Sequence, residues 1–137
     1  MNFKQWFIEM SLDTQQLLAA FLAHPDETTL LILADAMEAE GNGNSALLRS
    51  NDLFDKKFID WYGKHTFERP DGQNRQLTVE EMQQLKQWLP FIRKAVYDKN
   101  FQVPPGTLRT NLDNENLNYA RRAFYNFFKL IVGGTKV

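Results

Sequence analysis

Apolar residues along this chain recur in five stretches with the spacing of one face of an α-helix. The first stretch begins near Ser11, where Asp13 and Gln16 are spaced as a capping box. It should end at His24, because Pro25 disfavours the helical conformation in the residue before it. Its inner face consists of Leu17, Leu18, Phe21 and Leu22.

The second and third helices are predicted as a pair joined by a Gly/Asn segment. Pro25 fits the first turn of the second helix, where Asp26 and Glu27 suit the helix dipole. Gly41 or Gly43 should end it. Its buried stripe is Leu30, Leu33, Ala34 and Met37. The third helix should span about residues 45–64, with an inner face of Leu48, Leu53 or Phe54, Phe58, Ile59 and Tyr62.

The fourth helix should begin at the capping box of Thr78 and Glu81, after a loop over residues 63–76 with a turn at Pro70-Asp71-Gly72. Pro90 lies inside this helix and predicts a kink or a break near Trp88. The apolar face is Met82, Leu85, Leu89, Ile92 and Val96. A second loop begins at Val103, and the last helix should span about residues 115–132.

These elements predict an all-α fold, a compact single-domain bundle of five to six helices over residues 1–137. A short amphipathic helix over residues 2–10 and an extended piece near 101–103 are further expectations, and no strand pair is convincing. Hydrophobic residues make up 43% of the chain, and 11 Phe, 4 Tyr and 3 Trp provide area for a core.

The chain has no Cys, no apolar run of membrane-span length and no apolar segment typical of a signal peptide at its start. We therefore expect a cytoplasmic location and no membrane. Net charge is uneven: −6 over residues 1–40, −1 over 41–82 and +6 over 83–137. One explanation is structural: the acidic and basic parts pack against each other or lie on opposite solvated faces. The other is functional: the basic part meets an anionic partner.

Residues suited to catalysis are few. Neither His24 nor His65 has a serine or an acid at a telling spacing, and both fit surface or capping roles. No phosphate-binding loop, dinucleotide fingerprint or metalloprotease motif is present. We therefore expect no catalytic residue, no cofactor and no metal, and hence a protein that is not an enzyme.

The last helix carries a charge on its apolar face. Arg121 falls within the arc of Leu117, Phe124, Phe128 and Ile131, so it must be paired, reach the edge, or face a partner. A separate polar stripe consists of Asn118, Arg122, Asn126 and Lys129.

Basic and aromatic residues gather over residues 77–137. Such a surface suits nucleic-acid backbones and unstacked bases, but it is as typical of a protein–protein hot spot. The pI of about 6.1 is low for a dedicated nucleic-acid binder. The candidate partner-binding residues are Arg93, Lys94, Arg121, Arg122, Tyr125 and Lys129.

Residues 25–49 carry a family signature: Pro25-Asp26, Leu31, Ala34-Asp35, Met37-Glu38, Gly41-Asn42 and Leu47-Leu48-Arg49. This segment resembles an uncharacterised helical family described as a repeat-companion domain. The chain departs from that pattern at Ala36 (usually Trp), Asn44 (usually Arg) and Ala46 (usually Glu). The resemblance implies a helical hairpin and an accessory or adaptor role, with no reaction and no cofactor.

The same segment has a physical interpretation of its own. Asp35 and Glu38 share one helix face, Gly41 stops the helix, and Arg49 on the next helix can pair with Asp35. We expect a structural ion pair across the hairpin. Acid–base or metal chemistry at the two carboxylates would need a third ligand or a cleft partner, and none is evident.

The leading functional hypothesis is a small non-catalytic protein–protein interaction module, acting as adaptor, regulator or inhibitor, and a mobile-element origin would fit it. The alternative is nucleic-acid binding through the basic C-terminal helices. Head-to-tail self-association through the acidic and basic ends is another possible mode, and an enzyme centred on Asp35 and Glu38 is a minor third hypothesis.

Overall fold

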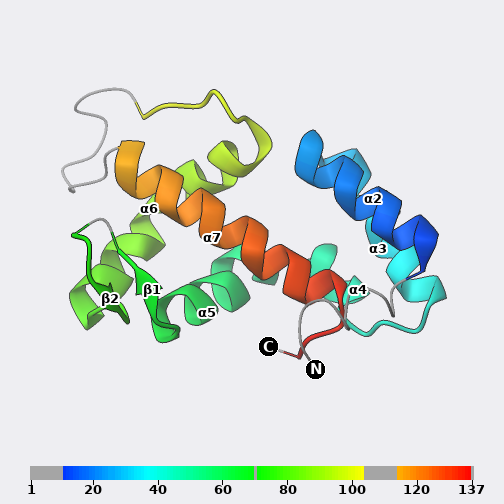
Figure 1. Ribbon diagram of the computed structural model, residues 1–137, viewed down its shortest axis with the longest axis horizontal. Helices are drawn as coiled ribbons and strands as arrows, with labels where there is room; N and C mark the ends of the chain where they lie inside the picture. The colour runs from blue at the N-terminus through cyan, green and yellow to red at the C-terminus, as the bar shows by residue number, and fades with distance from the viewer. Residues whose placement is uncertain (1–10, 70, 104–113, 137) are drawn as a thin grey trace. The chain divides into compact units, whose positions relative to one another are not determined.

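The computed structural model describes residues 11–69, 71–103 and 114–136 (Figure 1). These residues form six α-helices, a short π-helix and one two-stranded sheet, which confirms the all-α prediction. The chain groups into two compact units: unit 1 holds residues 1–53 and 126–137, and unit 2 holds residues 54–125. The helix expected over residues 2–10 lies outside the described residues. No described helix is long and apolar enough to cross a membrane.

Unit 1 begins with α2 (Leu12–Ala23). The Oγ of Ser11 accepts a 3.2 Å hydrogen bond from the backbone N–H of Thr14 and caps the helix. The prediction that Asp13 is the cap was therefore wrong, because the cap is Ser11 and the helix begins two residues earlier than a cap at Asp13 would allow. The end at His24 is confirmed, since its N–H closes the last turn on Ala20.

Helix α3 (Glu27–Ala39) follows, capped by Asp26 through a 2.7 Å hydrogen bond from Thr29. Pro25 precedes the cap rather than occupying the first turn, so that detail was wrong. Gly41 ends the helix with a φ of +78°, a conformation that glycine adopts without strain. The predicted stripe is buried throughout: Leu30, Leu33, Ala34 and Met37.

The single helix expected over residues 45–64 is instead three pieces: α4 (Ser45–Leu48), the π-helix η1 (Leu53–Phe58) and α5 (Ile59–Lys64). Ser50 Oγ accepts the N–H of Asp52, a local bond that competes with helix continuation. A π-helix holds more residues per turn than an α-helix. As a result both Leu53 and Phe54 are buried, and the predicted inner face is buried as well.

In unit 2, β1 (Phe67–Glu68) pairs antiparallel with β2 (Asn74–Arg75), with Phe67 opposite Arg75. Gly72 turns the hairpin with a φ of +82°. The expectation of no strand pair was wrong, because strands of two residues are too short to show an alternating pattern. The piece near 101–103 is not a strand.

Helix α6 (Val79–Tyr97) opens with the predicted capping box and continues through Pro90. The alternative of a broken helix was wrong. Pro90 has no N–H, so the carbonyl of Lys86, four residues earlier, loses its helical hydrogen bond. Both residues are exposed, so water can bond that carbonyl instead. Helix α7 (Asn114–Val132) gives its first part to unit 2 and its last part to unit 1.

Candidate functional site

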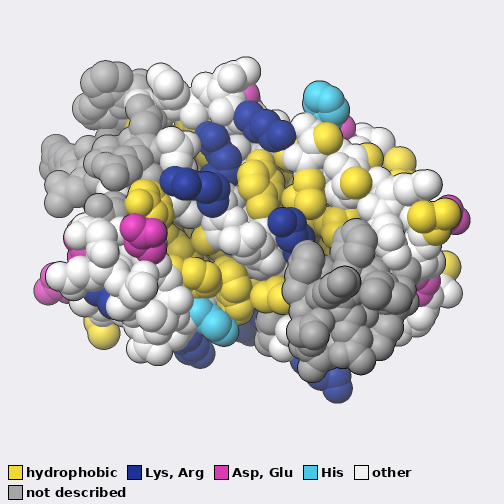
Figure 2. Space-filling view, in the orientation of Figure 1, with side chains coloured by type: hydrophobic (Ala, Val, Ile, Leu, Met, Phe, Trp, Pro, Cys, Tyr) yellow, Lys and Arg dark blue, Asp and Glu magenta, His cyan; other side chains and the backbone are white. Residues whose placement is uncertain are grey.

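The C-terminal half of α6 borders a groove of about 670 Å³ in unit 2, which we call the α6 groove. Its lining is mostly apolar and also includes four charged residues. Its lining residues are Asp55, Leu89, Pro90, Arg93, Lys94, Tyr97, Asp98 and Phe101. On the face drawn in Figure 2, Lys and Arg side chains lie beside hydrophobic ones along α7.

The far wall of the groove is formed by the turn that ends α6. The chain leaves the helix at Asp98, whose side chain accepts the N–H of Asn100 at 3.0 Å. The backbone N–H of Phe101 bonds the carbonyl of Asp98 at 3.0 Å, so the chain folds back on itself. This turn brings the Phe101 ring within 6.4 Å of Phe91 and 5.9 Å of the Lys94 ammonium.

Arg93 is held in place at the groove edge. Its Nη2 lies 3.1 Å from an oxygen of Asp55, and its guanidinium stacks 4.9 Å from the Phe54 ring centre. Asp55 is therefore its ion-pair partner, although the two side chains are 37% and 54% exposed. Lys94 is exposed, and its ammonium lies 5.9 Å from the centre of the Phe101 ring. Of the two basic residues in the groove, Lys94 is therefore the more available to a partner.

The structure shows what Arg121 does on the apolar face of α7. Its two terminal nitrogens donate to the carbonyls of Lys99 and Phe101 at 3.2 and 3.3 Å. Both acceptors belong to the turn that forms the groove wall. Arg121 is therefore a positioning residue for Phe101, and the sequence could not identify backbone acceptors 20 or more residues away.

The other predicted partner-binding residues have separate roles. Tyr125 donates to the Val96 carbonyl at 2.7 Å, joins α7 to α6, and has a pKa raised by burial. Arg122 lies exposed over the Tyr119 ring at 4.9 Å. Lys129 belongs to unit 1. The structure thus brings two of the six predicted residues, Arg93 and Lys94, into the groove lining.

The ion pair predicted in the family-like hairpin is present in unit 1. Arg49 Nη2 lies 2.5 Å from Asp35 and 3.0 Å from Glu38. The hydrogen bond to Asp35 raises the pKa of Arg49. Because the two carboxylate side chains are 75% and 68% exposed, solvent screens this cluster strongly. It links α3 to the residue that follows α4.

Two asparagines in the Gly/Asn segment have a role that the sequence analysis missed. The amide of Asn42 donates to the carbonyl of Val132 at 2.9 Å. The amide of Asn44 donates to the carbonyls of Ile131 and Thr135 at 3.0 and 2.9 Å. These side chains bond carbonyls of the last two residues of α7 and of Thr135, just beyond the helix, where helical donors run out. Asn44 stands where the resembled family usually has Arg, so the departure has a structural role here.

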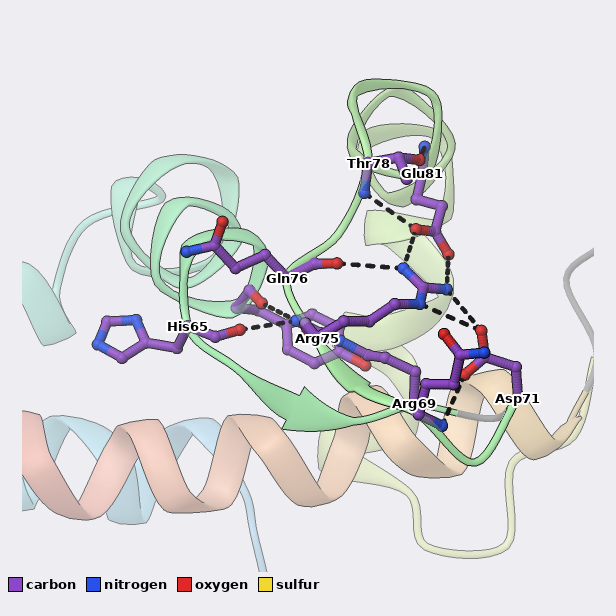
Figure 3. Close-up of polar contacts among 9 residues, drawn as sticks. His65, Arg69, Asp71, Arg75, Gln76, Thr78 and Glu81 are labelled. Carbon is purple, nitrogen blue, oxygen red and sulfur yellow. Dashed lines mark hydrogen bonds and ion pairs between the residues drawn. The ribbon is translucent and has the colours of Figure 1, made fainter.

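A second polar cluster surrounds the β1–β2 hairpin (Figure 3). Arg75 donates to both oxygens of Glu81, at 2.5 and 2.8 Å, and contacts Asp71 at 3.0 Å. Arg69 is completely buried among the backbone carbonyls of the same region. His65 bonds the Trp61 carbonyl through Nδ1 at 2.8 Å.

Within the described residues, no group of three or more His, Cys, Asp or Glu could hold a metal ion.

The Arg75–Glu81 pair predicts a specific loss of stability in acid. Hydrogen bonds from Arg75 lower the pKa of Glu81 from 4.5 to about 2. Because the folded-state pKa is the lower one, the pair contributes fully above about pH 4.5, and that contribution is lost as pH falls toward 2. The urea midpoint of Glu81→Gln should therefore fall less than that of the wild type as the pH is lowered from about 4.5 to 2.

The measurement is a series of urea unfolding curves at decreasing pH for the wild type and Glu81→Gln. Glu80→Gln, which removes the adjacent exposed carboxylate, is the matched control and should follow the wild type. Parallel curves for the wild type and Glu81→Gln would contradict the assigned role of the pair.

Comparison with known protein families, with curated proteins and with solved structures finds no match to this chain. The resemblance of residues 25–49 to the repeat-companion family therefore stays a prediction.

Proposed function

We propose that this protein is a small non-catalytic interaction module that holds a segment of a partner protein in the α6 groove. The observation that supports the proposal is an open, largely apolar groove with an exposed cation, Lys94, at its edge. The partner segment would place an aromatic or aliphatic side chain against Phe101 and Leu89. An adjacent acid on that segment would meet Lys94.

The charges of the groove favour a protein partner over a nucleic acid. Arg93 is paired with Asp55, and Asp98 also lines the groove. Carboxylates at these positions would repel phosphate groups, whose attraction to unpaired Lys and Arg supplies most nucleic-acid affinity. A rigid aromatic side chain beside a paired arginine is instead typical of a protein–protein hot spot.

The role would be that of an adaptor, regulator or inhibitor in the cytoplasm. This matches the accessory role that the resemblance of residues 25–49 implies. Self-association is a special case in which the partner segment comes from a second copy.

The test compares capture of partners from a native lysate, with and without nuclease, by the wild type, Phe101→Ala and Lys94→Glu. Lys64→Glu makes the same charge change at an exposed residue of α5 that does not line the groove, and is the matched control. A protein captured by the wild type and the control should bind Phe101→Ala about thirtyfold more weakly, a loss of about 2 kcal/mol.

Equal capture by all four proteins would remove the groove as the binding site. Capture that disappears with nuclease would favour the nucleic-acid alternative. Circular dichroism of each variant checks that the fold is retained; Phe101→Ala keeps the backbone carbonyl that Arg121 bonds.

A further inference from the structure

Helix α3 carries a second apolar surface outside its buried stripe. Leu31 and Ile32 are each 48% exposed, and they are two of the four large hydrophobic side chains that are exposed in the described residues. Acids lie on the same side of the helix: Glu27 stands one turn before Leu31 and Asp35 one turn after it, and both are exposed. We call Glu27, Leu31, Ile32 and Asp35 the α3 stripe.

The two aliphatic side chains are unusual for the outer face of a surface helix. The inner face of α3 is already buried through Leu30, Leu33 and Met37, and the opposite face of such a helix is normally charged or polar. A singly exposed leucine needs no explanation, whereas grouped apolar side chains with a polar rim mark surfaces that bind other proteins. The α3 stripe is therefore a candidate contact surface.

The two acids of the stripe differ in availability. Asp35 is bonded to Arg49 at 2.5 Å. Glu27 lies in the first turn of α3, and none of the ion pairs of the described residues includes it. Residues four apart on a helix have Cβ atoms about 5–6 Å from each other, so Glu27 and Leu31 lie side by side. The stripe thus presents a carboxylate next to an aliphatic side chain.

The α6 groove has the complementary pair of groups. The Lys94 ammonium lies 5.9 Å from the centre of the Phe101 ring, which is close to the spacing of Glu27 and Leu31 on α3. A helix laid in the groove can therefore place Leu31 on Phe101 while Glu27 meets Lys94. The net charges favour the same pairing, because residues 1–40 carry −6 and residues 83–137 carry +6.

We propose that the partner segment in the α6 groove is the α3 stripe of a second copy of this chain, an inference that rests on the proposed function and names its partner. The stripe belongs to unit 1 and the groove to unit 2. Two different surfaces therefore meet, and the contact is head to tail. Each copy offers one stripe and one groove, so assemblies grow with protein concentration unless a ring closes.

The test is sedimentation velocity of the full chain at concentrations up to about 0.5 mM. The average mass should rise with concentration, and high salt should weaken the association, because Glu27 and Lys94 are both exposed. The double variant Leu31→Ser, Ile32→Ser and the groove variant Phe101→Ala should each raise the dissociation constant at least about tenfold. Val79→Ser alters a side chain that is 76% exposed and does not line the groove, so it should associate like the wild type.

A mixture of the two weakened variants provides the second arm. The Phe101→Ala copy keeps its stripe, and the Leu31→Ser, Ile32→Ser copy keeps its groove. Because the contact is head to tail, the mixture should form one-to-one pairs with wild-type affinity and no larger assemblies. Circular dichroism checks that each variant keeps its fold.

A wild type that stays monomeric at about 0.5 mM would overturn the inference. Phe101→Ala that still loses a partner captured from lysate would then leave the proposed function standing. Unchanged association of the folded stripe variant would also overturn the inference, as would a mixture that fails to pair. If neither capture nor association depends on Phe101, the inference and the proposed function fail together.

Discussion

Replacing Arg69 with methionine should lower the free energy of unfolding by about 3 kcal/mol, because three carbonyls, one in a buried and two in part-buried hydrogen bonds, would lose this donor. Methionine fills similar space, so the loss reports the hydrogen bonds rather than a cavity. The carbonyls belong to Tyr62, His65 and Arg75, which join α5 to the β hairpin. Urea unfolding followed by circular dichroism measures the change.

Arg49→Met is the matched control for this prediction. Arg49 contacts two carboxylates, yet its side chain is 34% exposed and both acids are largely in solvent. Its unfolding midpoint should stay close to that of the wild type. If Arg49→Met proved as destabilising as Arg69→Met, the carbonyl contacts would not be what makes Arg69 important.

Phe124→Ala should lower the free energy of unfolding by about 3–5 kcal/mol. The ring is 1% exposed. It stacks on Phe54 with 4.5 Å between ring centres and meets Phe58 edge-on at 5.3 Å. Alanine would remove both aromatic contacts and leave a void that the rigid surroundings fill poorly. Chemical denaturation monitored by circular dichroism tests this.

Val79→Ala serves as the comparison for Phe124→Ala, since Val79 is 76% exposed at the start of α6. A surface truncation of this kind should change the free energy of unfolding by less than about 0.5 kcal/mol. A loss at Phe124 no larger than that at Val79 would mean that the aromatic cluster does not form the core of unit 2.

The helix faces could be predicted from the sequence because the apolar period is a local property. The stripe ending at Met37, the capping box at Thr78 and the pairing of Arg49 with Asp35 all depend on residues close in sequence. Where the local pattern was short, the prediction failed. The two-residue strands and the interruption after α4 are examples, because a few local hydrogen bonds decide such structures.

Most of the candidate site depends on contacts that no local pattern reveals. Arg121 bonds carbonyls that any residue type could provide, and Asn42 bonds a carbonyl 90 positions away. Arg69 resembled an ordinary loop charge because nothing near it in sequence indicates burial. Arg93 and Lys94 were found because basic residues beside aromatics are visible in sequence, but the groove wall depends on the turn at Asp98.

The discontinuous make-up of unit 1 has a consequence for the order in which the chain folds during synthesis. Residues 54–125 form unit 2 from a single uninterrupted stretch. The first segment of unit 1 is made before unit 2, but it packs against the last segment of the chain. The Phe128 ring stacks on Phe21 at 4.4 Å between centres, and Asn42 bonds the end of α7. Domains generally fold as their chain emerges. Unit 2 begins later in the chain but ends before unit 1 does, so it can complete its fold first, while the N-terminal helices wait for the end of α7.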